Sequence, residues 1–328
     1  MSAKSNGAAH AAGNGASANG ASANGASANG ASADGAGGTT SNGPVNRASG
    51  TLIIIGGHED KEGDRIILRA LAERARGGAL VVVTAASNVP DEVWGDYEPL
   101  FRDLGVDDVR HLHVDAREEA RDPERVRLLD GATVVFITGG NQLKLTSQLG
   151  DTPVYERMRE IYEQGGCIAG TSAGASVVSE TMMVTGDSSS SPHVEDALRM
   201  APGFGFLPGV VVDQHFAERG RIGRLIGAVA QNPRVLGVGV DEDTAIVCEG
   251  HRMFTVLGSG GVYVLDGRDV THSNLVDEAR ERTLGVFGLR LHLLNTGDTF
   301  DLSTRRPECH SATEAEARLA GVGAEGRK

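Results

Sequence analysis

The sequence predicts an α/β fold of three layers, in which helices cover both faces of a mostly parallel sheet. Two observations predict it. Continuous apolar runs of strand length alternate along the chain with amphipathic stretches of helical length. Five of the apolar runs are followed directly by glycines or by side chains that can react or bind, and parallel sheets bind their ligands at the carboxyl ends of the strands.

The apolar runs and the helical spacing give the elements in order. We expect strands at 51–55, 79–84, 111–114, 133–138, 167–169, 209–213 and 235–240, followed by antiparallel strands at 244–248, 253–256 and 261–264. We expect helices at 65–76, 98–104, 123–129, 154–164 and 220–231. In the first of these helices, Ile66, Ile67, Leu71 and Ala75 form the apolar set.

The folded part is expected to be a single α/β domain over residues 49–310. Residues 1–48 consist almost entirely of Ala, Gly, Ser and Asn, with repeats of Gly-Ala-Ser-Ala-Asn. Such a segment cannot bury enough apolar surface to offset its chain entropy, so we expect a disordered low-complexity tail. Residues 311–328 are expected to form a C-terminal tail.

Composition excludes several classes of function. The net charge of −13 argues against a nucleic-acid partner. No segment approaches 18 consecutive apolar residues, so no membrane span is expected. Cys167, Cys248 and Cys309 lack metal-site spacing and indicate reduced thiols, which predicts a cytoplasmic protein without a metal. The run from Gly56 to Asp60 lacks the spacing of a nucleotide-binding loop, so no cofactor is expected.

A strand-turn-helix elbow is predicted around Ser172, within the sequence Gly170-Thr171-Ser172-Ala173-Gly174. Small residues on both sides of a serine are typical of a tight turn that exposes a nucleophilic hydroxyl. The alternative is a plain tight turn, because Gly, Ser and Ala are common in this chain. The amide of Ala173 and the glycine pair Gly139-Gly140 are candidate donors to an oxyanion.

A serine nucleophile needs a base, and His215 follows an apolar strand whose end is predicted to lie near Ser172. An acid must orient the histidine, and the next strand ends in Asp241, Glu242 and Asp243, among which spacing does not choose. The order Ser, His, acid differs from the Ser, acid, His order of α/β-hydrolases.

An arginine cluster follows His215. Arg221 and Arg224 share one face of a predicted helix, and Arg219 precedes it. The cluster is interpreted as a clamp on substrate carboxylates, since guanidinium groups bind carboxylates through two hydrogen bonds, or alternatively as a solvated basic face.

Together these stretches resemble the cyanophycinases, serine peptidases of the peptidase E clan. The matching motifs are TLIIIGGHED (51–60), TAAS (84–87), FITGGNQLKL (136–145), GTSAGAS (170–176), the stretch 202–225 with DQHFAERGRIGR, and GVGVDEDTAI (237–246). The resemblance implies a glutamine amidotransferase-like, flavodoxin-like fold. It also implies Ser172 as nucleophile, His215 as base and Glu242 as acid. It further implies a substrate pocket formed by Gln142, Lys144, Asp213, Gln214, Arg219, Arg221 and Arg224.

The resemblance also implies a substrate and an assembly. Cyanophycinases hydrolyse cyanophycin, a poly-aspartate with arginine on each side-chain carboxyl, to β-aspartyl-arginine dipeptides. Arginines and glutamines of the pocket would then hold aspartyl carboxylates, and Asp213 would receive the substrate guanidinium. No cofactor or metal is implied, and a homodimer is expected. The alternatives are a peptidase-E-like dipeptidase for other aspartyl or β-aspartyl peptides and a non-catalytic binding module.

Overall fold

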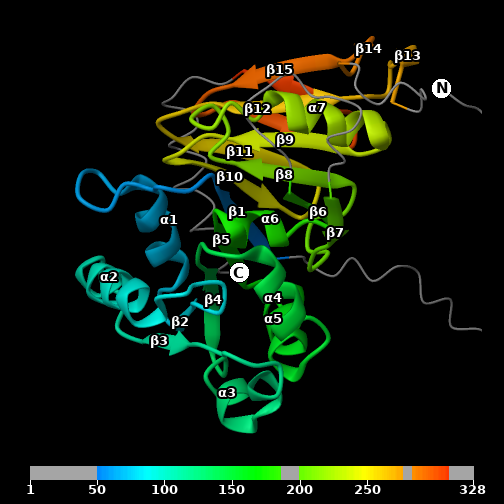
Figure 1. Cartoon of the computed structure of the whole chain (residues 1–328). Helices are drawn as coiled ribbons and strands as arrows, with labels where there is room; N and C mark the ends of the chain where they lie inside the picture. The colour runs from blue at the N-terminus through cyan, green and yellow to red at the C-terminus, as the bar shows by residue number, and fades with distance from the viewer. Residues whose placement is uncertain (1–49, 186–198, 276–282, 310–328) are drawn as a thin grey trace, which may run out of the picture. The chain divides into compact units, whose positions relative to one another are not determined.

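The apolar runs form two large β-sheets, shown in Figure 1, and two further sheets of the described residues have two strands each, β6-β7 and β13-β14. The computed structural model describes residues 50–185, 199–275 and 283–309, so the two predicted tails lie outside the described residues. The elements are β1 (Thr51–Ile55), α1 (Ile66–Arg74), β2 (Ala79–Val83), α2 (Pro90–Asp103), β3 (Val109–Leu112), the 3-10 turn η1 (Glu119–Arg121), α3 (Pro123–Arg127), β4 (Ala132–Ile137), α4 (Gln142–Leu149), α5 (Pro153–Glu163), β5 (Cys167–Thr171), α6 (Ala173–Val177), β6 (Thr181–Thr185), β7 (Arg199–Pro202), β8 (Val210–Gln214), α7 (Ile222–Gln231), β9 (Leu236–Val240), β10 (Thr244–Glu249), β11 (Met253–Gly258), β12 (Val262–Asp266), β13 (His272–Ser273), β14 (Val286–Phe287), β15 (Arg290–Leu294), β16 (Thr299–Asp301) and β17 (Arg306–Glu308).

The larger sheet has nine strands in the order β17-β16-β11-β10-β1-β5-β4-β2-β3. The strands β1, β5, β4, β2 and β3 are parallel to one another, as predicted. The strands β10, β11, β16 and β17 extend the sheet in antiparallel order. The sheet is therefore mixed, and its parallel half is the part that the apolar runs separated by helices predicted.

Helices cover both faces of the parallel half, which confirms the predicted layers. Alternate residues of β1 separate the two faces: Leu52 and Ile54 join the core beneath α4, α5 and α6, whereas Ile53 and Ile55 join the core beneath α1 and α2. Figure 1 shows α1 and α2 on one side of this sheet and α4 and α5 on the other. These four side chains are fully buried, so β1 is central to both cores.

The second sheet has four strands in the order β15-β12-β9-β8. Valines 212, 238 and 264 on three of these strands join the core that contains α4 to α6. The opposite face of the sheet packs against α7 through Leu225 and Val229. Strands β8 and β9 were expected in the main sheet, but they belong to this second sheet.

Several elements differ from the prediction. Helix α2 begins eight residues before the predicted start at 98, because Pro90 at its first turn suits a helix start and Pro99 is accommodated inside the helix. Strand β3 begins two residues earlier than predicted. Helix α4 and the strands from β13 onward lack a strong apolar period and were not predicted. Among the described residues, no helix is both long and apolar enough to cross a bilayer.

Backbone hydrogen bonds join the two sheets where the predicted site residues lie. Within the nine-stranded sheet, the amide of Ser172 donates to the carbonyl of Ile55 at 3.1 Å, and from the end of the four-stranded sheet the amide of His215 donates to the carbonyl of Gly56 at 2.8 Å. The amide of Asp243 donates to the carbonyl of Gly57 at 2.9 Å. The strand ends therefore meet, as predicted, but along a seam between two sheets rather than at the edge of one.

Candidate active site

Ser172 stands on a sharp turn between β5 and α6. Its backbone has φ 55° and ψ −110°, a conformation that L residues rarely adopt and that surrounding contacts must hold in place. The flanking glycines permit close packing: a Cβ on Gly170 would lie 2.2 Å from the carbonyl oxygen of Gly174, and one on Gly174 would lie 2.1 Å from that of Ile137. The two glycines of G-x-S-x-G are therefore needed at this elbow, because any larger side chain would collide with the backbone.

Ser172, His215 and Glu242 form a chain of hydrogen bonds. The Ser172 hydroxyl lies 2.9 Å from Nε2 of His215, and Nδ1 of His215 lies 2.6 Å from Oε1 of Glu242. The histidine is 3% exposed, and the serine is half-buried. Because a carboxylate accepts only, Nδ1 donates to Glu242, which leaves Nε2 free to accept the proton of Ser172.

The structure distinguishes Glu242 from its two acidic neighbours. The carboxylate of Asp241 accepts from the amides of Ala217 and Gly261, at 2.9 and 3.0 Å. The carboxylate of Asp243 accepts from the amide of Asp60 and the hydroxyl of Ser259, at 2.8 and 2.7 Å. Both aspartates therefore hold loops together, and the side chain that reaches His215 is that of Glu242.

Burial lowers the pKa of His215 below its usual value, and the hydrogen bond to Glu242 opposes this shift only in part. The neighbouring Arg219 and Arg221 also lower this pKa. The imidazole is therefore neutral at neutral pH, which is the state that a general base needs.

The predicted oxyanion donors lie beside the serine. A Cβ placed on Gly139 would lie 3.3 Å from Cβ of Ser172, so this loop approaches the elbow closely. Within the described residues, no hydrogen bond uses the amides of Gly139, Gly140 or Ala173. These N–H groups thus have no protein partner among the described residues, and Gly139 lines the cavity that opens over Ser172.

A cavity of about 650 Å³ opens over Ser172 and His215. Its remaining walls come from the segment after β1, from α2, from the ends of β4 and β5, and from the loop between β8 and α7. They are formed by His58, Glu59, Asp60, Lys61, Glu62, Val93, Asp96, Tyr97, Thr138, Gly139, Thr171 and Arg219. Of the predicted substrate-binding residues, Arg219 alone lines this cavity, and its side chain is exposed.

Asp213, Arg221 and Arg224 form a buried ion cluster beneath His215. The carboxylate of Asp213 is 1% exposed and accepts hydrogen bonds from both guanidinium groups. Arg221 also donates to the side-chain oxygen of Gln214 at 2.8 Å, and burial lowers the pKa of Arg221 to about 10. Both guanidinium groups thus share one protein carboxylate, an arrangement that the spacing of these residues in the sequence did not predict.

Gln142 and Lys144 also bind protein groups. The amide of Gln142 donates to the carbonyl of Met183 at 2.7 Å, and the ammonium of Lys144 donates to the carbonyl of Ser87 at 3.1 Å. Neither residue lines the cavity. Their contacts connect α4 to neighbouring segments of the chain.

The sequence analysis missed Glu59, which lies 4% exposed in the cavity wall. Its carboxylate accepts from the hydroxyl of Thr171 at 2.6 Å and from the hydroxyl of Tyr97. Glu59 therefore holds the residue before Ser172. The signal was the polar sequence His58-Glu59-Asp60 at the carboxyl end of the first strand, which the sequence analysis used as a family motif and rejected as a nucleotide loop without giving Glu59 a role.

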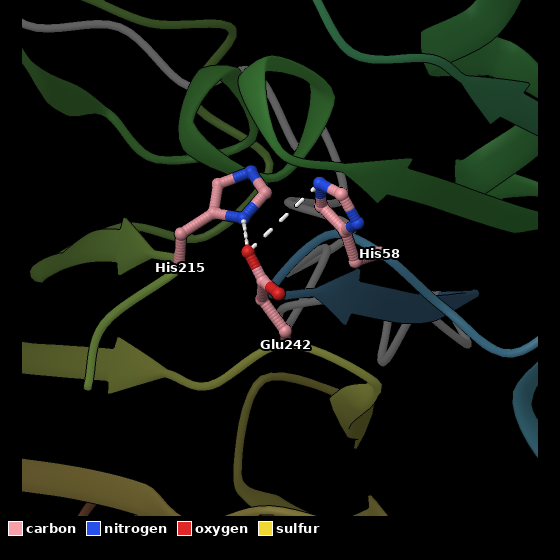
Figure 2. A group of neighbouring side chains, drawn as sticks. All are labelled: His58, His215 and Glu242. Carbon is pink, nitrogen blue, oxygen red and sulfur yellow. Dashed lines mark hydrogen bonds and ion pairs between the residues drawn. The ribbon is translucent and has the colours of Figure 1, made fainter. Parts of the chain in front are cut away.

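Among the described residues, one group of side chains has ligand atoms close enough to hold a metal ion, namely His58, His215 and Glu242. Figure 2 shows both imidazole rings beside the Glu242 carboxylate. Nε2 of His58 lies 3.9 Å from Oε1 of Glu242, and the ring of His58 packs edge-on against that of His215 at 5.4 Å.

Comparison with known proteins decides the family. The sequence profile of Peptidase family S51 matches residues 52–256. The chain belongs to Peptidase family S51. This membership confirms the resemblance predicted from the motifs and identifies the protein as a serine peptidase.

Relatives of this S51 peptidase support the same assignment. It is 39% identical over 260 residues to the cyanophycinase of Synechococcus elongatus, covering 78% of this chain and 80% of the relative. It is 40% identical over 257 residues to the cyanophycinase of a Nostoc species, covering 77% of this chain and 86% of the relative. The crystal structure of a peptidase from an acI-B1 Actinobacterium shares the fold, with a TM-score of 0.59 and 24% identity over 78% of this chain and 98% of that one.

Proposed function

We propose that this S51 peptidase is a cytoplasmic serine exopeptidase that hydrolyses cyanophycin to β-aspartyl-arginine dipeptides. The observation that carries the proposal is the continuous hydrogen-bonded chain from Ser172 through His215 to Glu242 at the base of an open cavity. The cyanophycinases to which the chain is similar supply the choice of polymer.

In the proposed first step, Oγ of Ser172 attacks the scissile carbonyl carbon while its proton passes to Nε2 of His215. Glu242 keeps the ring oriented and stabilises the imidazolium that forms. The amides of Gly139, Gly140 and Ala173 donate to the developing oxyanion. His215 then returns the proton to the leaving amine, and an acyl-enzyme ester remains.

In the second step, a water molecule attacks the ester and gives its proton to His215. The ester bond breaks, His215 protonates Oγ of Ser172, and the acid product leaves. The three residues that move and stabilise the proton, Ser172, His215 and Glu242, already lie within hydrogen-bond distance of one another. No cofactor enters the proposed cycle.

Substrate recognition is proposed for charged groups that line the cavity. The exposed guanidinium of Arg219 is positioned to bind a substrate carboxylate. Glu62 and Asp96 are exposed carboxylates of the same cavity and are proposed to receive the guanidinium of the arginyl side chain, which at Asp96 would replace the exposed ion pair with Lys61. They take the role that the sequence analysis gave to Asp213, whose oxygens are occupied.

The deciding experiment uses the purified protein and insoluble cyanophycin. Clearing of the suspension with release of β-aspartyl-arginine, measured by mass, supports the proposal. Cleavage of other aspartyl or β-aspartyl dipeptides without clearing would favour the peptidase-E-like alternative. Binding to the polymer without turnover would favour a binding module. Light scattering coupled to size exclusion tests the expected homodimer.

A further inference from the structure

We propose that Zn²⁺ binds His58, His215 and Glu242 and thereby switches the peptidase off. The three ligand atoms lie within 4.8 Å of one another, and they come from the segments that follow β1, β8 and β9. Two imidazoles and one carboxylate are a ligand set that zinc accepts in proteins, where a fourth position is filled by water. The mechanism proposed above uses two of these residues and has no role for His58.

The distances require only a small rearrangement. Zinc bonds to nitrogen and oxygen at about 2.0–2.2 Å, so tetrahedral ligand atoms lie roughly 3.4 Å apart. Nδ1 of His215 and Oε1 of Glu242, now 2.6 Å apart, must separate slightly. Nε2 of His58, now 3.9 Å from that oxygen, must move slightly closer.

The exposure of His58 makes this movement inexpensive. Its side chain is 72% exposed, so the ring can turn without opening the core. His58 and His215 both line the cavity, where a zinc-bound water would also have room, and Figure 2 shows the His58 ring beside the Glu242 carboxylate. The Glu242 side chain is 28% exposed and can likewise adjust, whereas the buried His215 is already held in place.

The inhibitory consequence follows from the protons on His215. In the active form, Nδ1 carries a proton toward Glu242 and Nε2 accepts the proton of Ser172. When zinc bonds to Nδ1, a neutral imidazole carries its proton on Nε2 instead. No net proton is released from the ring, but Nε2 now donates to Oγ of Ser172 and cannot act as a base. Zinc also occupies the carboxylate that would stabilise the imidazolium.

Zinc inhibition and direct zinc binding test the proposal together. The experiments use the full chain with Cys309→Ser, since Cys309 is an exposed thiol that would also bind zinc. We expect micromolar Zn²⁺ to inhibit hydrolysis, excess EDTA to restore it, and Mg²⁺ and Ca²⁺ to have little effect, because they prefer sites built from oxygen ligands. For each variant, the zinc concentration for half inhibition is the one that halves the rate which that variant shows without zinc.

His58→Ala is the decisive variant, and His272→Ala is its matched control, because His272 is an exposed histidine on β13. We expect His58→Ala to raise the half-inhibitory zinc concentration at least tenfold and His272→Ala to leave it unchanged; loss of even an outer-shell partner typically costs about 10–100-fold in affinity. His58→Gln, which keeps a polar side chain of similar size, should behave as His58→Ala does.

Calorimetric titration with Zn²⁺ separates this proposal from the proposed function, because it needs no substrate. His58→Ala should bind one zinc ion fewer than the parent chain. Equal zinc binding by the two proteins, equal sensitivity of their activities to zinc, or activation of hydrolysis by zinc would each overturn the proposal. If cyanophycin is not hydrolysed but the site is lost in His58→Ala, the zinc site stands and the proposed function fails.

Discussion

The hydroxyl of Thr171 donates a 2.6 Å hydrogen bond to the buried carboxylate of Glu59. Tyr97 of α2 donates to the same carboxylate, so one side chain links the strand that carries Ser172 to a helix of the opposite layer. Burial raises the pKa of Tyr97 well above its usual value, and the negative charge of Glu59 and the hydrogen bond that Tyr97 donates to it add to this shift. By accepting from Thr171 and Tyr97, Glu59 is suited to fix the position of the turn that carries Ser172.

We expect Glu59→Gln to destabilise the protein by about 1–3 kcal/mol, because the amide offers one acceptor oxygen where two donors converge. It should also lower kcat, since Thr171 directly precedes Ser172. Urea unfolding and steady-state kinetics measure the two effects. Glu62→Gln, an exposed change in the same loop, is the stability control. Unchanged stability and rate in Glu59→Gln would show that the linkage has no energetic role.

Ser172→Ala should reduce turnover by on the order of a thousandfold or more while leaving the melting temperature close to that of the parent protein. The reason is that the alanine removes the attacking oxygen without changing burial. Ser147→Ala, at an exposed serine of α4, should retain full activity. Near-parental activity of Ser172→Ala would exclude this residue as the nucleophile.

Glu242→Gln should move the acid limb of the kcat/KM profile to lower pH and reduce its plateau. Activity requires neutral His215, whose pKa burial depresses below 6.5, so the rate falls only as pH drops through that lowered value. The bond to Glu242 raises this pKa, and its removal therefore lowers it further. A pH–rate series from pH 4 to 9 measures the shift, and movement of the limb to higher pH would contradict the pairing.

The same depressed pKa contributes to stability. The unfolded chain binds a proton on this histidine near pH 6.5, whereas the folded protein binds it only at lower pH. The contribution is complete above the unfolded value and is lost as pH falls through the folded value.

Asp213→Asn should destabilise the protein by about 3–5 kcal/mol, since two guanidinium groups would lose their buried counter-charge. Asp266→Asn is a matched control: Asp266 is also almost fully buried, and it pairs with Arg268 and Arg305 away from the cavity. Both variants should melt earlier. We expect Asp213→Asn alone to lower kcat/KM at a temperature where both remain folded, because its cluster supports His215. Equal kinetics in the two variants would make the cluster purely structural.

Arg219→Ala should raise KM for cyanophycin by about 10–100-fold with a smaller effect on kcat, which corresponds to the loss of one charge-assisted hydrogen bond. Arg219 lines the cavity, and its positive charge is close enough to His215 to lower the pKa of that histidine. Arg252→Ala changes a distant arginine whose side chain is 79% exposed and serves as control. A KM equal to that of the parent would remove Arg219 from substrate binding.

The sequence predicted the local features well because they depend on neighbours in the chain. The small residues around Ser172 predict an elbow, since only small side chains fit a strand-to-helix turn of this tightness. The apolar runs predict strands, and their alternation with helices predicts the parallel half of the main sheet. Long-range choices were beyond these patterns: the run 210–214 has the same composition whether it pairs with the first sheet or the second.

The same limit applied to the charges. The spacing of Arg221 and Arg224 predicts that they share one face of a helix. It does not show that Asp213 lies opposite them, so their pairing with this carboxylate could not be predicted. Glu242 could be chosen over Asp241 and Asp243 only through the resemblance, since all three occupy consecutive positions. Glu59 escaped notice because its partners, Thr171 and Tyr97, are distant in sequence.

The proposed nucleophile and its base follow strands of different sheets: Ser172 follows β5 of the nine-stranded sheet, and His215 follows β8 of the four-stranded one. The distance between Oγ of Ser172 and Nε2 of His215 therefore depends on how the two sheets pack against each other. A substitution in the core between the two sheets, far from any bound substrate, would change this distance and slow proton transfer even if each sheet kept its own structure.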